Sequence, residues 1–158
     1  MNMYFKEATI SDVTIIHKLM IKAFSEYKND KMPSSALEET ESNIAKALSQ
    51  EGEKALIAYE SDEPVAMVRF KIEQYKMNFY RLSVNPLYQG KGVGKYLLKS
   101  LELYAKNEGV AEIICKVRMN IKRNVCLYKD IGYSIFDYYT IDKPNKKSLH
   151  IVSMKKFI

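Results

Sequence analysis

Apolar side chains recur along this chain with two different periods, and the changes between the periods predict its elements. Residues 3–8 read as a short strand, and Ser11 or Asp12 then caps a helix. The apolar face of that helix repeats every three or four positions, at Val13, Ile16, Leu19, Met20, Ala23 and Phe24. A polar stretch at 27–33 ends it. A capping box at 35–38 predicts a second helix that continues to about residue 49.

Strand patterns dominate the rest of the chain. Runs rich in β-branched and aromatic residues, bounded by turn residues, predict strands at 55–59, 65–70, 79–84, 112–118, 133–141 and 149–157. The first two form a hairpin through Pro64, and the last two form another around Lys143, Pro144 and Asn145. Helical spacing predicts one helix from Val93 to a C-cap at Gly109 and another at 121–131.

The junction between the strand at 79–84 and the helix after it carries the most specific chemistry. Three glycines occupy alternate positions there, Gly90, Gly92 and Gly94. Glycine allows positive φ and a close approach of backbone N–H groups to a ligand. The helix adds unpaired N-terminal donors and the positive end of its dipole. The sequence therefore predicts a phosphate-binding loop.

Two common phosphate loops do not fit this spacing. A Walker loop needs a glycine where Gln89 stands and a serine or threonine where Tyr96 stands. A dinucleotide-binding loop needs a third glycine in the place of Lys95. It also needs an acidic residue at the end of the next strand, where Glu112 instead lies at the start. We therefore expect neither of these nucleotides.

The pattern Gln-Gly-x-Gly-x-Gly after a strand ending in Val-Asn-Pro resembles the acyl-coenzyme A pyrophosphate loop of the GNAT N-acetyltransferase superfamily. A later segment, Leu127-Tyr128 before Gly132-Tyr133, matches the superfamily's second motif. The resemblance covers nearly the whole chain. It implies one N-acetyltransferase domain over 1–158, of the α+β class. Its GNAT-like central sheet is mixed and largely antiparallel, with about six to seven strands flanked by about four helices.

This resemblance also implies a reaction, in which an acetyl group moves directly from acetyl-CoA to a primary amine of a small molecule, peptide or protein. Tyr128 stands in the place of the general acid that protonates the coenzyme thiolate. Asn124, one helical turn earlier, would bind the pantetheine arm, with Asn120 as the reserve candidate. The residues expected to bind the coenzyme are Leu82, Ser83, Val84, Gln89, Gly90, Lys91, Gly92, Val93, Gly94, Lys95 and Asn124.

The strand at 79–84 departs from the superfamily pattern, because many relatives carry a glutamate there and this chain has no acid between Asn78 and Val84. Either Glu73 acts as the base through water, or the amine arrives neutral, and we assign no base. Arg81 is either a strand-face arginine paired with a glutamate or a clamp for a carboxylate on the acceptor. The missing acid keeps open an alternative function, a non-catalytic acyl-CoA sensor or partner-binding module.

Composition narrows the remaining classes. The chain has 158 residues, is 47% hydrophobic and carries a net charge of +6. Its lysines are scattered without a nucleic-acid motif, so we expect no nucleic-acid partner, and Lys91 and Lys95 instead favour a polyanionic coenzyme. Two separated cysteines and two histidines predict no metal site or disulfide framework. No signal peptide or membrane-spanning run occurs, so we expect a cytoplasmic protein, a monomer or a homodimer paired through an exposed final strand.

Overall fold

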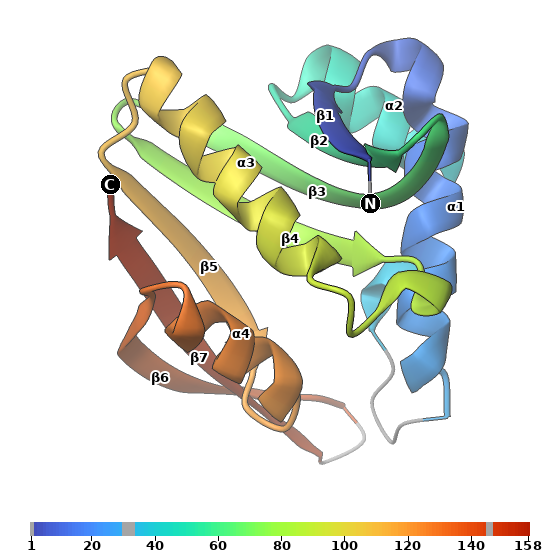
Figure 1. The fold of residues 1–158 in the computed structure, drawn as a ribbon. Coiled ribbons are helices and arrows are strands. Elements are labelled where there is room, and N and C mark those ends of the chain that lie inside the picture. The colour runs from blue at the N-terminus through green and yellow to red at the C-terminus, as the bar shows by residue number, and fades with distance from the viewer. Residues whose placement is uncertain (1, 30–33, 145–146) are drawn as a thin grey trace.

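The computed structural model of the chain describes residues 2–29, 34–144 and 147–158. Within these residues, seven strands form one twisted sheet in the order β1-β2-β3-β4-β5-β7-β6 (Figure 1). The strands are β1 (Met3–Glu7), β2 (Lys54–Glu60), β3 (Glu63–Glu73), β4 (Lys76–Val84), β5 (Glu112–Arg118), β6 (Ser134–Asp142) and β7 (Ser148–Phe157). All neighbours run antiparallel except the parallel pair β4–β5. The predicted mixed, largely antiparallel sheet of the α+β class is confirmed.

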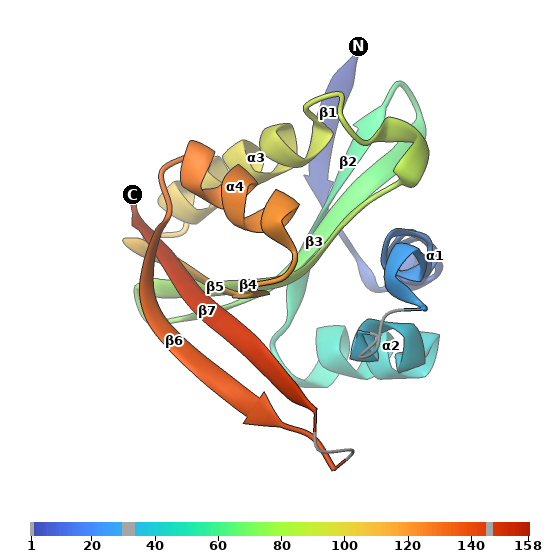
Figure 2. The same cartoon turned by 90° about the horizontal axis from the view of Figure 1, so that it is seen from below.

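Four α-helices of the described chain cover the two faces of this sheet: α1 (Val13–Phe24), α2 (Glu41–Gln50), α3 (Val93–Asn107) and α4 (Lys122–Asp130). Figure 2 shows α3 and α4 on one face and α1 and α2 on the other. Short 3₁₀ turns connect them, namely η1 (Ile10–Asp12), η2 (Ser25–Tyr27), η3 (Ser35–Glu38) and η4 (Pro86–Tyr88). None of the described helices is long and apolar enough to cross a membrane.

Each face of the sheet buries its own apolar cluster. Under α3, the stripe of Leu97, Leu98 and Leu101 packs on the central strands, and these side chains are fully buried. Under α1 and α2, Ile16 and Ile44 pack against the opposite face. Alternation along the strands supplies both clusters, because successive side chains point to opposite faces. The buried faces of α1 and α3 are the apolar faces that the helical spacing of the sequence predicted.

The predicted helix from residue 35 to about 49 is wrong, because the structure divides this segment in two. Residues 35–38 form only the turn η3, and Glu39 and Thr40 are extended, with ψ of 136° and 165°. A second capping box then starts α2: Thr40 Oγ1 accepts from the Asn43 N–H at 3.1 Å, and Asn43 Oδ1 accepts from the Thr40 N–H at 2.9 Å. A competing cap signal inside the segment therefore overrode the first one.

The final strand is also not the sheet edge that the sequence suggested. β7 lies between β5 and β6 and pairs with both along its length, so the exposed edge on this side is β6. The predicted hairpin of the last two strands is confirmed; Asn145 of its turn lies outside the described residues. The second strand of this hairpin, β7, is the one that pairs with β5 over 112–118, which leaves β6 as the outer strand.

Candidate active site

The sheet opens between its two parallel strands. β4 and β5 pair over three positions only, Lys76 with Glu112, Met77 with Ile113 and Asn78 with Ile114. Beyond Asn78, β4 carries a bulge, because two residues, Arg81 and Leu82, lie opposite the single Val68 of β3. A bulge increases local twist and bends the strand. Two cavities of about 490 Å³ and about 370 Å³ lie where the strands separate.

The glycine loop and the start of α3 line the smaller cavity. Gly90 and Gly92 both line the cavity, and their φ angles are +75° and +81°. A residue with a side chain would be strained in this backbone conformation. Gly92 is the N-cap of α3, so the unpaired N–H groups of this helix begin at the cavity. Backbone donors, a helix N-terminus and Lys95 fit a phosphate-bearing ligand.

Most residues expected to bind the coenzyme line this smaller cavity: Val84, Gln89, Gly90, Gly92, Val93, Gly94 and Lys95. Leu82 and Asn124 line both cavities and so mark their junction. Two residues lie differently. Ser83 is fully buried, and its hydroxyl donates to the Arg81 carbonyl oxygen at 2.9 Å. Lys91 does not line the cavity; its ammonium stands 5.4 Å from the centre of the Tyr88 ring. Their roles toward the coenzyme stay predictions.

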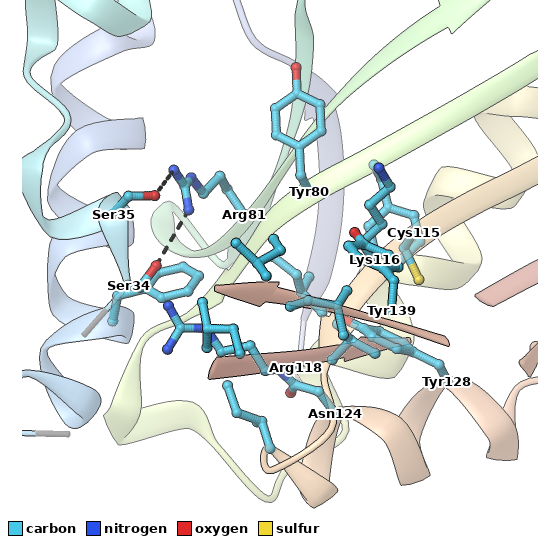
Figure 3. Close-up of a pocket in the computed structure, with 18 of the residues that line it drawn as sticks. Ser34, Ser35, Tyr80, Arg81, Cys115, Lys116, Arg118, Asn124, Tyr128 and Tyr139 are labelled. Atoms are coloured by element: carbon cyan, nitrogen blue, oxygen red, sulfur yellow. Dashed lines mark hydrogen bonds between the residues drawn. The ribbon is translucent and has the colours of Figure 1, made fainter. Parts of the chain in front are cut away.

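The helix α4 places Asn124 and Tyr128 on one side, as its spacing predicted, and both line the larger cavity (Figure 3). The reserve candidate Asn120 lines neither cavity. The Tyr128 ring is buried and packs edge-on against Phe79, with 5.6 Å between ring centres. Burial, with a smaller contribution from neighbouring Cys115, raises the pKa of the Tyr128 hydroxyl above its ordinary value. This hydroxyl therefore stays protonated at neutral pH.

Arg81 occupies the bulge on the opposite wall, in the left-handed region with φ of +57°. Its Nε donates to Glu39 Oε1 at 2.7 Å, and its Nη2 donates to Ser35 Oγ at 3.1 Å. A longer contact of 3.4 Å joins Nη1 to Ser34 Oγ. Figure 3 shows the guanidinium reaching toward both serines. The pairing of Arg81 with a glutamate is confirmed. Because Arg81 also lines the larger cavity, its role as a clamp for an acceptor carboxylate stays a prediction.

A buried ionic network holds this wall. Arg69 binds Glu53 through two hydrogen bonds, of 2.8 and 3.1 Å, and these two side chains are about 96% buried. Arg69 also donates to Glu39 at 2.9 Å, and the Tyr80 hydroxyl donates to Glu53 at 2.6 Å. Burial and this last bond raise the pKa of Tyr80. The network therefore links β3, β4 and the two ends of α2 through Glu39 and Glu53.

The family model of the acetyltransferase (GNAT) family matches residues 15–133, three quarters of the chain, and this stretch contains the glycine loop, Asn124 and Tyr128. The chain belongs to the GNAT acetyltransferase family. Members of this family are acetyl-CoA dependent N-acetyltransferases, as the resemblance in the sequence implied. No curated protein matches the sequence significantly.

Solved structures show the same fold at low sequence identity. The ribosomal-protein-S18-alanine N-acetyltransferase from Escherichia coli matches with a TM-score of 0.79 and 16% identity over 99% of this chain and 94% of that one. PaiA N-acetyltransferase from Thermoplasma acidophilum, solved with coenzyme A, matches with a TM-score of 0.77 and 17% identity over 100% of both chains. An acetyltransferase from Salmonella typhimurium with its cofactor acetyl-CoA gives 0.78 and 16% over 99% and 94%.

Several residues that line these two cavities were not predicted from the sequence, among them Arg123, Phe24 and Glu38. Arg123 of α4 donates to Gln89 of the loop at 3.1 Å and to Glu26 of η2 at 3.0 Å, and it lines the smaller cavity. Phe24 lines both cavities, and Glu38 lines the larger one. Phe24 is the last residue of a predicted apolar helix face, and Glu38 is the last residue of a predicted capping box. Local structure therefore accounted for both residues, and the sequence offered no reason to assign them to a site. Only Arg123 had a usable signal, since it lies one position before Asn124.

The structure limits which acidic side chains could serve as the general base. Glu73 lies at the β3–β4 hairpin, at the far end of β4 from the loop, and lines neither cavity. Glu39 and Glu53 are engaged by the arginines. His17 also lines neither cavity, and its Nε2 is 2.9 Å from the Glu39 carbonyl oxygen. Among the described lining residues, Glu38 is the acidic side chain of the larger cavity.

Proposed function

We propose that this enzyme moves an acetyl group directly from acetyl-CoA to a primary amine of a small molecule, peptide or protein, with Tyr128 as the general acid. One observation carries the proposal. Asn124 lines both cavities, and Tyr128, one turn later on α4, lines the larger one; the smaller cavity is lined by the glycine loop, and the larger is the space proposed for the acceptor. Positioning two reactants against one another is itself a large part of such catalysis.

The loop-side residues bind and orient the coenzyme in this proposal. Bound acetyl-CoA supplies an activated acetyl thioester. The backbone N–H groups around Gly90, Gly92 and the start of α3 bind the pyrophosphate, and Lys95 adds positive potential. Leu82, Ser83 and Val84 offer main-chain groups to the pantetheine arm, and Asn124 offers an amide. The glycine loop thus sets the distance from the phosphates to the reacting carbonyl.

Tyr128 moves the proton at the other end. The acceptor nitrogen attacks the acetyl carbon, the carbon–sulfur bond breaks, and the Tyr128 Oη proton passes to the departing sulfur. Tyr128 then regains a proton from solvent, and the proton that the attacking nitrogen loses also leaves to solvent. β4 carries no acidic residue, and the carboxylates of Glu39 and Glu53 are engaged by arginines. In this proposal the acceptor therefore enters as the neutral amine, without a dedicated carboxylate base on β4.

The experiment is amine-dependent thiol release from acetyl-CoA with a pooled amine panel, comparing two matched variants. Tyr128→Phe keeps the buried ring and removes only the hydroxyl. We expect kcat to fall by roughly 100-fold or more, the range for general acid catalysis. Tyr133→Phe is the control, because Tyr133 belongs to the same aromatic cluster but lines neither cavity. We expect its kcat to stay within about twofold of wild type.

Two outcomes count against the proposal. If both variants retain wild-type kcat, Tyr128 is a core aromatic residue and not the acid. If acetyl-CoA binds tightly and no amine releases its thiol, the chain is the non-catalytic acyl-CoA sensor. Binding of acetyl-CoA itself, measured by calorimetry in both variants, separates loss of chemistry from loss of the site.

A further inference from the structure

The larger cavity carries an excess of basic side chains on several walls. Four of its described lining residues are basic, Arg81 of β4, Lys116 and Arg118 of β5, and Lys143 after β6. Glu38 is the acidic one. The cavity lies on the side of Leu82 and Asn124 away from the glycine loop, so the coenzyme phosphates have Lys95 and Arg123 in the other cavity. The basic groups of the larger cavity therefore face the acceptor.

Two of these charges lack a compensating carboxylate in the described chain. Arg81 and Arg69 are balanced by Glu39 and Glu53, two cations against two anions. Lys116 and Lys143 form no ion pair with any described residue, and Lys116 Nζ stands 5.6 Å from the centre of the Tyr139 ring. These two ammonium groups outweigh Glu38, so the cavity attracts negative charge and repels a polycationic amine.

Arg81 adds directional donors to this field. A guanidinium has five N–H groups. Three serve Glu39, Ser34 and Ser35, which leaves two without a partner among the described residues. The bond to Glu39 and the bulge hold the group in one orientation, so little side-chain freedom is lost when it binds a ligand. The hydroxyls of Ser34 and Ser35 can turn to donate to the same anion.

We infer that the acceptor is a small amine that also carries a carboxylate, of the size of an amino acid or dipeptide, with its carboxylate held by Arg81, Lys116 and Lys143. The inference rests on the proposed function. The volume of about 490 Å³ suits a ligand of this size.

The test is a matched acceptor series. Each ω-amino acid from glycine to 5-aminopentanoate is compared with its carboxamide, which has nearly the same size and no negative charge. We expect kcat/KM to favour the acid by about 10-fold or more at its best chain length, the effect of one charge-assisted pair. The amide's amine is less basic, so a larger fraction of it is neutral, and this bias works against the expected result.

Variants locate the effect. Lys116→Gln with Lys143→Gln is expected to bring the acid-to-amide ratio within about threefold of one, and Arg81→Lys to lower the ratio while keeping the charge. Lys46→Gln is the matched control, because Lys46 is exposed on α2 and lines neither cavity. Its ratio should equal that of wild type. The affinity for acetyl-CoA is measured in all variants.

Each result decides the question. Acids and amides used equally well overturn the inference while leaving the acetyltransferase proposal intact, and so does a ratio that the lysine variants do not change. A loss of acetyl-CoA affinity at an unchanged ratio assigns the lysines to the coenzyme and also overturns it. Failure of every amine to release thiol is instead a failure of the proposed function.

Discussion

Tyr128 and Tyr133 share one aromatic cluster, yet their hydroxyls have different surroundings. Tyr128 lines the larger cavity, whereas the Tyr133 hydroxyl is buried without a hydrogen-bond partner in the described chain. Burial raises the pKa of both. Only Tyr128 can therefore reach a bound ligand, and the difference arises from its place on α4, one turn after Asn124, and not from residue type.

The raised pKa of Tyr128 predicts the alkaline side of the pH–rate profile. In the proposed mechanism its hydroxyl is the acid, so activity needs the protonated form, and a pKa above the ordinary 10 keeps that form through pH 10. We expect kcat/KM to rise with pH as the acceptor amine becomes neutral and then to stay level up to about pH 10. A profile recorded from pH 6 to 10 checks this. A decline beginning below pH 9 would show that the acid has a lower pKa than its burial implies.

Among the elements, the broken segment between η3 and α2 has the largest consequence for the site. In a continuous helix, the direction of the Glu39 side chain would be set by the helical rotation. The extended residues Glu39 and Thr40 instead let Glu39 reach Arg69 of β3 and Arg81 of β4 together. A short irregular stretch thus connects the start of α2 to β3 and the bulged strand β4, and the capping box of Thr40 and Asn43 sets where this stretch ends.

Glu39→Gln tests this fastening. Burial acts to raise the pKa of Glu39, but Arg69 and Arg81 outweigh it and lower the pKa below its ordinary 4.5. A lowered folded-state pKa means that the carboxylate stabilises the fold above pH 4.5 and that this contribution is lost as pH falls through the folded value. At pH 7 we expect a loss of about 2–3 kcal/mol, less than the roughly 3–5 kcal/mol of a fully buried pair.

The measurement is urea unfolding at pH 7 and at steps down to pH 3. The gap between wild type and Glu39→Gln should narrow below pH 4.5. Glu51→Gln, at the exposed end of α2, is the control and should change stability by under about 0.5 kcal/mol at every pH. An equal gap at pH 7 and pH 3 would assign the effect to packing and not to the carboxylate charge.

On the scale of the whole molecule, the opening between β4 and β5 joins two cavities that different layers complete. The glycine loop and α4 frame one, and β4, β5, β7 and η3 frame the other. Arg123 spans the rim of the loop-side cavity by contacting both Gln89 and Glu26. We expect a phosphate-bearing ligand in that cavity to compete with Glu26 for this guanidinium, which would couple η2 to coenzyme binding.

Glu26→Gln is therefore expected to tighten coenzyme A binding. The pair is exposed, so its strength is at most about 1 kcal/mol, and the dissociation constant should fall by no more than about fivefold. Arg123→Gln should raise it. Isothermal titration calorimetry at low salt measures both, with Glu108→Gln, at the far end of α3, as the control. Weaker binding in Glu26→Gln would mean that the ion pair preorganises Arg123 for the ligand.

The sequence alone determined most of the local structure along the chain. The strands, the buried stripes of α1 and α3, the glycine loop and the Asn124–Tyr128 pair depend on residues within a few positions of one another, so their spacing predicted them. The larger cavity, in contrast, depended on tertiary structure. The Arg81–Glu39 pair joins residues 42 positions apart, and the bulge, the divergence of β4 and β5, the place of β7 and the reach of Arg123 each need strands or helices brought together by folding. Sequence thus determined which coenzyme to expect, and only the packing of distant elements decided which charged side chains line the larger cavity.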